Sequence, residues 1–297
     1  MFGQWESLVI FTLLNVMLTV GVYVTAMSGQ LSLATAAIAG LGGYAAAILT
    51  RNFGWPFVPA ILMGAVVGAF VGAFIAAVTL RMRDFILKLT TLAFGEMIAV
   101  VAFNIDYIGG ANSFTGIPAY TGFWNCLIGV LIATYLAWRF DGSRLGFASR
   151  AVRDDVVAAA ATGISVLQVR VVTFALGAAI CGAAGALQAH YMLIVSPQEL
   201  GFFVSLNFII FLLFGGMHVL WGAMLGATVL TILPELMRFT TEYRHVLFGL
   251  IITVVVLFRP QGLIPRIPTG VSGRFSRAGR RRASKLSSAE NDQWRLG

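Results

Sequence analysis

Nine apolar stretches, most of them as long as a helix that crosses a bilayer, fill most of this 297-residue sequence. A transmembrane helix needs roughly 20 mostly apolar residues, because the hydrocarbon core is about 30 Å thick. Inside that core every backbone polar group must be satisfied within the protein, which favours helices. We therefore expect an all-α, polytopic membrane protein with about nine transmembrane helices (8–10). The predicted spans are residues 5–27, 31–50, 57–80, 85–106, 119–138, 171–194, 201–217, 219–237 and 244–258. Glycine-rich stretches such as AGLGGYAAA could be broken or re-entrant rather than straight.

Composition excludes most soluble classes. Hydrophobic residues make up 59% of the chain and charged residues 11%, whereas soluble domains are about half apolar and about a quarter charged. The sequence lacks the phosphate-binding pattern GxxxxGK[ST] and the hydrolase patterns GxSxG and HExxH. The two cysteines and three histidines show no metal-ligand spacing. We therefore expect no enzymatic activity, no bound cofactor and no metal site in this chain.

Positive charge indicates the orientation of the chain. Of the 20 Lys and Arg residues, 17 lie in the turn 81–88, in the segment 139–170 or from residue 259 onward. Cytoplasmic loops carry an excess of Lys and Arg, so we expect these three regions in the cytoplasm, the N-terminus outside and the C-terminus inside. Residues 1–265 would form the membrane domain, and residues 266–297 a basic, disordered tail. The charge of that tail fits topology and contact with anionic lipid better than nucleic-acid binding.

One cytoplasmic segment, within 139–170, reads as a short helix of small residues. Asp154 and Asp155 precede Ala158–Ala161, and Gly163 follows them. Acidic residues favour a helix start and alanines favour its interior. A smooth face of this kind suits docking into a groove of another protein. A solvated connecting helix is the alternative, and the residues alone leave both open.

Three polar residues are candidates for a solute pathway. Glu96 lies near the centre of a predicted span, where a carboxylate is costly and usually faces a cavity or a partner. Asn207 lies inside another apolar segment, and Asn112 lies in the loop DYIGGANSFTGIP on the predicted outer face. Glu96 could instead serve helix packing, and the loop could be a tight extracellular turn.

A repeated GxxxG pattern predicts close helix packing. Gly64, Gly68 and Gly72 are four residues apart on one helix face, and small residues at this spacing let transmembrane helices approach closely. The partner helix could belong to this chain or to a second subunit.

Seven blocks of sequence resemble the LivM-type permease subunit of bacterial branched-chain amino-acid importers, in the same order along the chain. The blocks are LKLTTLAFGEM (87–97), IGGANSFTGIP (108–118), SRLGFASRAVRDDVVAAAATGIS (143–165), GAAGALQAHYMLIVSP (182–197), LLFGGMHVLWGAMLGA (212–227), LPEL (233–236) and LFRPQGLIP (257–265). Thr35 or Ala34 stands where this family usually has a histidine.

The resemblance implies a type II ABC-importer-like permease of the bacterial inner membrane. It implies that the short cytoplasmic helix is a coupling helix that contacts an ATPase through Asp154, Asp155, Ala158, Ala159 and Gly163. Val157 stands where the broader pattern has a glutamate, so an apolar contact is expected there. The implied partners are a second, LivH-type permease, two ATPases and an extracytoplasmic solute-binding protein. The implied cargo is a branched-chain amino acid, or another amino acid, an amide or urea.

Two other functions remain to be weighed. A self-sufficient secondary transporter or channel would work without ATP and would leave the alanine-rich helix without a task. A membrane-embedded enzyme would need catalytic polar groups at one membrane depth, and the sequence shows no such set.

Overall fold

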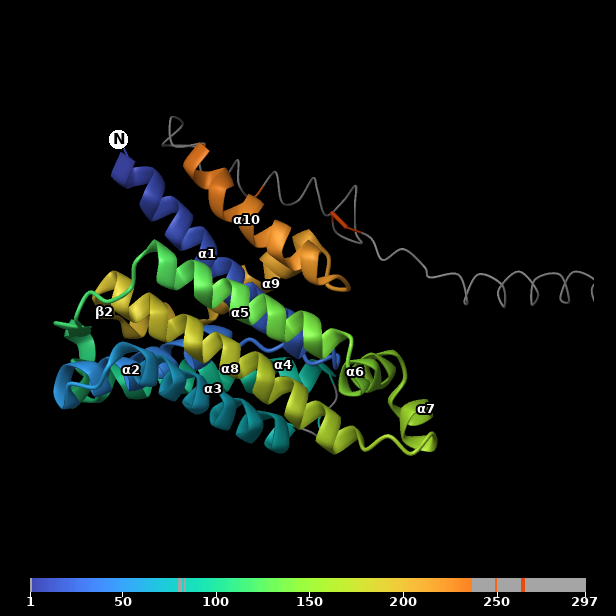
Figure 1. The fold of residues 1–297 in the computed structure, drawn as a ribbon. Helices are drawn as coiled ribbons and strands as arrows, with labels where there is room; N and C mark the ends of the chain where they lie inside the picture. Colours follow the sequence, from blue (N-terminus) through green and yellow to red (C-terminus); the bar gives the residue numbers. More distant parts are fainter. Residues whose placement is uncertain (1, 80–81, 83, 237–248, 250–262, 265–297) are drawn as a thin grey trace, which may run out of the picture. The chain divides into compact units, whose positions relative to one another are not determined.

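The computed structural model describes residues 2–79, 82, 84–236, 249 and 263–264, and within them the chain is a bundle of helices (Figure 1). Its α-helices are α1 (Phe2–Ala26), α2 (Thr35–Phe53), α3 (Phe57–Thr79), α4 (Asp84–Asn104), α5 (Phe123–Asp141), α6 (Arg144–Asp154), α7 (Val156–Ala161), α8 (Val166–Met192), α9 (Phe202–Gly215) and α10 (Leu220–Leu236). The shorter elements are η1 (Asp106–Ile108), η2 (Gly110–Asn112), β1 (Phe114–Thr115), β2 (Ile194–Val195) and η3 (Pro197–Leu200).

Helix α8 lies at the centre of the bundle and packs against α1, α2 and α3. Glycine makes these contacts close. A Cβ added to Gly43 would lie 3.0 Å from the backbone oxygen of Gly185, and one added to Gly21 would lie 2.8 Å from that of Gly177. Backbones that touch in this way leave no room for larger side chains, so the small-residue composition of α8 follows from its central position.

Five helices of the described residues are long and apolar enough to cross a membrane, namely α1, α3, α4, α5 and α8. This confirms a mostly helical, multi-pass membrane protein. Helix α2 is continuous rather than broken, and it ends at Gly54, whose φ of 64° is left-handed. The predicted span 244–258 lies outside the described residues.

Helices α9 and α10 differ from the two separate spans expected at 201–217 and 219–237. They form a pair bent by 119°, which could count as one broken span or as a re-entrant loop. The 14 residues of α9 reach about 21 Å, less than the roughly 30 Å of a bilayer core. Gly215 and Gly216 allow the bend, since Gly216 has a φ of 117°.

The loops gather at two opposite ends of the bundle. At one end β1 and β2 pair in antiparallel fashion, with Phe114 opposite Val195, and α2 holds them: the Tyr44 hydroxyl donates to the Val195 oxygen over 3.4 Å, and the Arg51 guanidinium lies 4.7 Å from the Phe114 ring centre. At the other end α6 and α7 join α5 to α8, and Arg153 of α6 lies against Gly29 in the loop after α1. Figure 1 shows the two ends on the left and right of the bundle.

Candidate functional site

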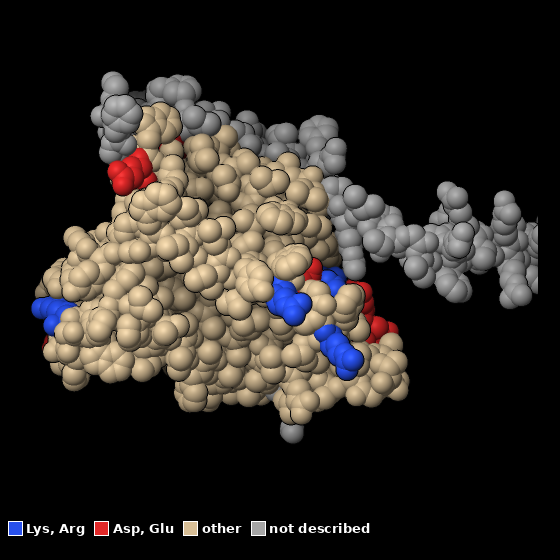
Figure 2. All heavy atoms as spheres, in the orientation of Figure 1, with Lys and Arg blue, Asp and Glu red and all other residues tan. Residues whose placement is uncertain are grey.

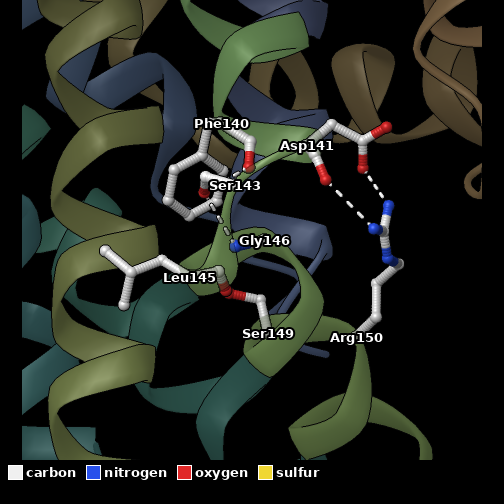
Figure 3. A network of polar contacts seen from close by, with 7 residues as sticks. All are labelled: Phe140, Asp141, Ser143, Leu145, Gly146, Ser149 and Arg150. Atoms are coloured by element: carbon white, nitrogen blue, oxygen red, sulfur yellow. Dashed lines mark hydrogen bonds and ion pairs between the residues drawn. The ribbon is translucent and has the colours of Figure 1, made fainter.

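A polar network fixes the corner between α5 and α6. Ser143 caps α6 by accepting a hydrogen bond from the Gly146 amide at 3.1 Å, and such caps satisfy an otherwise free helix donor. Arg150 pairs with the Asp141 carboxylate and also donates to the Asp141 backbone oxygen. Figure 3 shows Arg150 and Asp141 facing each other across the turn. The Ser143 cap and the Arg150–Asp141 pair therefore set the direction in which α6 leaves the bundle.

Helix α7 begins at a side-chain cap. One oxygen of the Asp155 carboxylate accepts from the Val157 amide at 2.8 Å and from the Ala158 amide at 3.0 Å. The helix ends before Gly163, whose φ is +84°. Asp155 and Gly163 thus delimit a helix of six residues, too short to form stably without such ends and its packing.

The residues predicted to contact an ATPase do not all face outward. Asp154, Asp155, Ala158 and Gly163 are exposed, whereas Ala159 is 4% exposed and packs in a small core with Val152 and Val169. The most exposed apolar side chain of α7 is that of Val157, which is 79% exposed. Among these positions a partner would meet Val157 and Ala158, while Ala159 holds α7 against α6 and α8.

The three predicted pathway residues lie apart from one another. Glu96 is on α4, and its carboxylate accepts a hydrogen bond of 2.7 Å from the Phe202 amide, the first residue of α9. Glu96 therefore caps a neighbouring helix. Asn112 is exposed in η2 and Asn207 is exposed on α9. The structure does not bring them together, and their part in a pathway stays a prediction.

The predicted glycine face lies inside this chain. Gly64, Gly68 and Gly72 are buried, and α8 covers them. A Cβ added to Gly64 would lie 2.9 Å from the Ala186 Cβ, and one added to Gly68 would lie 3.1 Å from the Gly182 Cα. Among the described residues the partner of this face is therefore α8.

A cavity of about 240 Å³ lies between α1, α2, α8, α9 and the short helix η3. One face of each helix forms a wall. Ala36, Ala39, Gly40 and Gly43 line it from α2, Phe11, Asn15 and Leu18 from α1, Gly185, Gln188 and Ala189 from α8, Val204 and Phe208 from α9, and Ile194, Val195, Ser196, Glu199 and Leu200 from the segment after α8. The spacing of three or four residues on α1 and α2 is that of one helix face.

Polar groups are few in this cavity. Glu199 and Gln188 are its largest polar side chains, and the Asn15 amide is already used, since it donates to the Thr231 hydroxyl at 3.1 Å. Glu199 is accessible to solvent at the cavity. The protein around its carboxyl still removes part of its hydration, and this desolvation raises the pKa of the carboxyl above the ordinary value. Leu193, just before β2, has a left-handed φ of 61°, a costly conformation for a residue other than glycine.

The sequence did not predict a role for Glu199, Gln188 or Asn15. Asn15 and Gln188 are isolated polar residues in the apolar runs LLNVML and GALQAH, and such residues usually face a bundle interior or a cavity. That signal could have found them. Glu199 carries no such signal, because it follows a span rather than lying within one.

One face of the molecule carries its charged residues toward its two ends. Figure 2 shows Lys, Arg, Asp and Glu toward the two ends of the face it draws, with an uncharged surface over α3, α5 and α8 between them. An uncharged belt of this kind suits contact with lipid.

Comparison with known proteins identifies the family. Residues 5–257 match the family described as the permease component of the branched-chain amino acid transport system. The chain belongs to this family of permeases. It is 27% identical to the high-affinity branched-chain amino acid transport system permease protein LivM of Salmonella typhimurium, over 86% of this chain and 68% of that protein. It is 26% identical to LivM of Escherichia coli over the same shares.

A second type of permease is also similar. The Escherichia coli permease protein LivH is 32% identical over 126 residues, which cover 42% of this chain and 41% of that protein. No solved structure matches the chain. The relatives are transport permeases, which agrees with the expectation drawn from the ordered sequence blocks.

Proposed function

We propose that this permease is one subunit of an ATP-driven importer that carries a branched-chain amino acid, or a related small polar solute, into the cell. The observation that carries the proposal is the match over residues 5–257, together with similarity to LivM relatives over 86% of the chain. ATP hydrolysis takes place in separate subunits, because this chain lacks the phosphate-binding pattern.

We infer that α7 is the coupling helix. Three features support this role: the capped start at Asp155, the exposed Val157 and Ala158, and the small core around Ala159. Together they make α7 a short, rigid helix that can be moved as a unit by a bound ATPase. Closure of an ATPase dimer would move α7 and shift the permease between two arrangements. Such coupling requires that the ATPase contact α7 differently in the two states.

The proposed assembly contains a second, LivH-type permease, two cytoplasmic ATPases and an outer solute-binding protein. Similarity of this chain to both LivM and LivH supports two related permeases. In the proposed orientation the N-terminus lies outside, and the C-terminus and the tail from residue 266 lie in the cytoplasm. In this orientation α6 and α7 meet the ATPases, and the β1–β2 end meets the binding protein.

The test is ATP-dependent uptake of L-leucine by the complete importer in liposomes. Ala158→Glu places a charge on the exposed face of α7 and should reduce uptake about ten-fold or more, the effect of roughly 1.4 kcal/mol of lost contact, while the complex still assembles in the membrane. Gln168→Glu, at an exposed position on the first turn of α8, is the matched control and should transport like the parent protein. Uptake that is intact in Ala158→Glu would refute docking through α7. Gradient-driven uptake by this chain alone, without ATP, would show a self-sufficient transporter instead.

A further inference from the structure

We propose that the cavity between α1, α2, α8, α9 and η3 binds the transported amino acid, with the Glu199 carboxylate accepting hydrogen bonds from its α-ammonium group. The proposal rests on the proposed function, because it takes the cargo to be an amino acid. It assigns a stage at which the permease itself holds the solute.

The size and lining of the cavity suit a small aliphatic solute. Its volume of about 240 Å³ is below the range of roughly 300–1,000 Å³ typical of sites for larger ligands. Leu18, Val204 and Phe208 supply apolar contact, while alanines and glycines of α2 keep the opposite wall smooth. Apolar walls with few polar groups are typical of sites that select a small molecule by shape and orientation.

Glu199 has no positively charged partner among the described residues. The ion pairs found there join Arg150 to Asp141 and Arg153 to Asp154, both at the other end of the bundle. Arg51, at the same end as Glu199, lies instead on the Phe114 ring. The Glu199 carboxylate is exposed at the cavity and is therefore available to accept charge-assisted hydrogen bonds from an ammonium group.

The backbone around the cavity holds Glu199 in place. Leu200, the next residue, is 2% exposed, and its side chain fills the space that a Cβ on Gly40 would need, at 2.6 Å from the Leu200 Cγ. Gly40 thus lets η3 sit close to α2, with Glu199 at the cavity. Glu199 also forms a turn with Ser196, whose oxygen accepts from the Glu199 amide at 3.1 Å.

Gln188 supplies a second polar group from α8. Its side chain lines the cavity, and an amide both donates and accepts hydrogen bonds. Glu199 can therefore take the ammonium group while the Gln188 amide meets the solute carboxylate. Two such contacts would orient the amino acid and leave its side chain toward the apolar walls.

The cavity lies at the end of the bundle away from α7. Gln188 is 22 residues beyond Val166, the first residue of α8, which corresponds to about 33 Å along the helix. In the proposed orientation this is the outer end, where a delivered solute would arrive. Glu199 and Ile194 are exposed there, so the cavity reaches the surface.

The direct test is ligand binding to the complex of both permeases and both ATPases, without the solute-binding protein, in lipid nanodiscs. Calorimetric titration would compare L-leucine with 4-methylpentanoate, which lacks the ammonium group. We expect L-leucine to bind about 10- to 100-fold more tightly, the range that one hydrogen-bonded charge pair supplies. Equal binding of the two compounds, or no binding of L-leucine, would overturn the proposal.

Two matched variants separate the carboxylate from the charge of this end. Glu199→Gln should weaken L-leucine binding to the level of 4-methylpentanoate. Asp106→Asn removes one exposed acid from η1 at the same end, outside the cavity lining, and should bind like the parent protein. A melting temperature of Glu199→Gln at or above that of the parent protein shows that folding is intact. If Glu199→Gln and Asp106→Asn behave alike, Glu199 does not hold the ligand.

Failure of this inference can be told apart from failure of the proposed function. Uptake by the complete importer measures the function, and ligand binding without the solute-binding protein measures the cavity. Leucine uptake by the parent protein with unchanged uptake and binding in Glu199→Gln would overturn only the cavity proposal. No amino-acid uptake by the parent importer, with all partners present, would overturn the proposed function and this inference with it.

Discussion

Substitution of Gly68 should weaken the central packing of the bundle. A Cβ at this position would overlap the backbone oxygen of Ala178 and lie 3.1 Å from the Gly182 Cα. Both neighbours are main-chain atoms of α8, so relief requires the two helices to separate. Overpacking costs about 1–3 kcal/mol, and alanine returns up to about 1 kcal/mol through its better helix propensity. Because the overlap is with main-chain atoms, the upper part of that range, about 2–3 kcal/mol, applies, and we expect Gly68→Ala to lower the free energy of unfolding by about 1–2 kcal/mol.

Gly95→Ala is the matched control for this change. It adds the same methyl group inside α4, where the new Cβ would make only ordinary contacts, the nearest at 3.5 Å from the Leu33 backbone oxygen. Unfolding of the purified permease can be followed by circular dichroism during titration of mixed micelles with sodium dodecyl sulfate. Equal stabilities of Gly68→Ala and Gly95→Ala would show that the α3–α8 contact is not as close as described.

Two further predictions concern the ends of the bundle. Asp155→Ala removes the cap of α7 and should destabilise that helix by about 0.5–2 kcal/mol, visible as faster amide hydrogen exchange at Val157 and Ala158; Asp154→Ala, which leaves the cap in place, should exchange like the parent protein. L-leucine binding should weaken as pH falls through the pKa of Glu199, and this loss should begin above the ordinary glutamate value of about 4.3, because burial raises that pKa. Among the described residues Tyr44 also interacts with Glu199, but a tyrosine does not ionise in this pH range, so the binding of Glu199→Gln should not change there. Because the pKa is raised in the folded protein, Glu199 ionises first in the unfolded state as pH rises. The stability linked to Glu199 is therefore fully present below its unfolded pKa and is lost toward neutral pH. The melting temperature of Glu199→Gln should accordingly not fall between pH 4 and 7 relative to the parent protein.

The helices could be predicted because the length of an apolar run reflects the thickness of the bilayer and the spacing of its glycines reflects helix packing. The sequence predicted a mostly helical, multi-pass permease, and α1, α3, α4, α5 and α8 have the length and composition of spans. The region 201–237 was harder, because hydropathy does not record direction. The runs on either side of Gly215 and Gly216 look like spans, yet the chain bends by 119° between them.

Side-chain roles were less predictable than helices. The family resemblance implied that Ala158 and Ala159 both contact an ATPase. Adjacent residues of a helix point about 100° apart, so Ala158 is exposed and Ala159 packs against Val152 and Val169. Glu96 was a candidate for the solute pathway because it is a carboxylate within a predicted span, and in the structure it caps the first turn of α9. The cavity could not be predicted, because its walls come from helices far apart in sequence and its carboxylate lies in η3.

Helix α8 connects the two proposed sites physically. It begins three residues after Gly163 and ends at the residue before Leu193, where β2 and then η3 carry the chain past the cavity. Along its length glycines place it against the backbones of α1, α2 and α3. Small slides of packed helices against one another are one way in which such a bundle can change its arrangement. Helix α8 would therefore carry a displacement of α7 over about 33 Å to Gln188. A solute that binds one arrangement of the cavity more tightly would in turn favour one position of α7, because coupling between two sites is reciprocal.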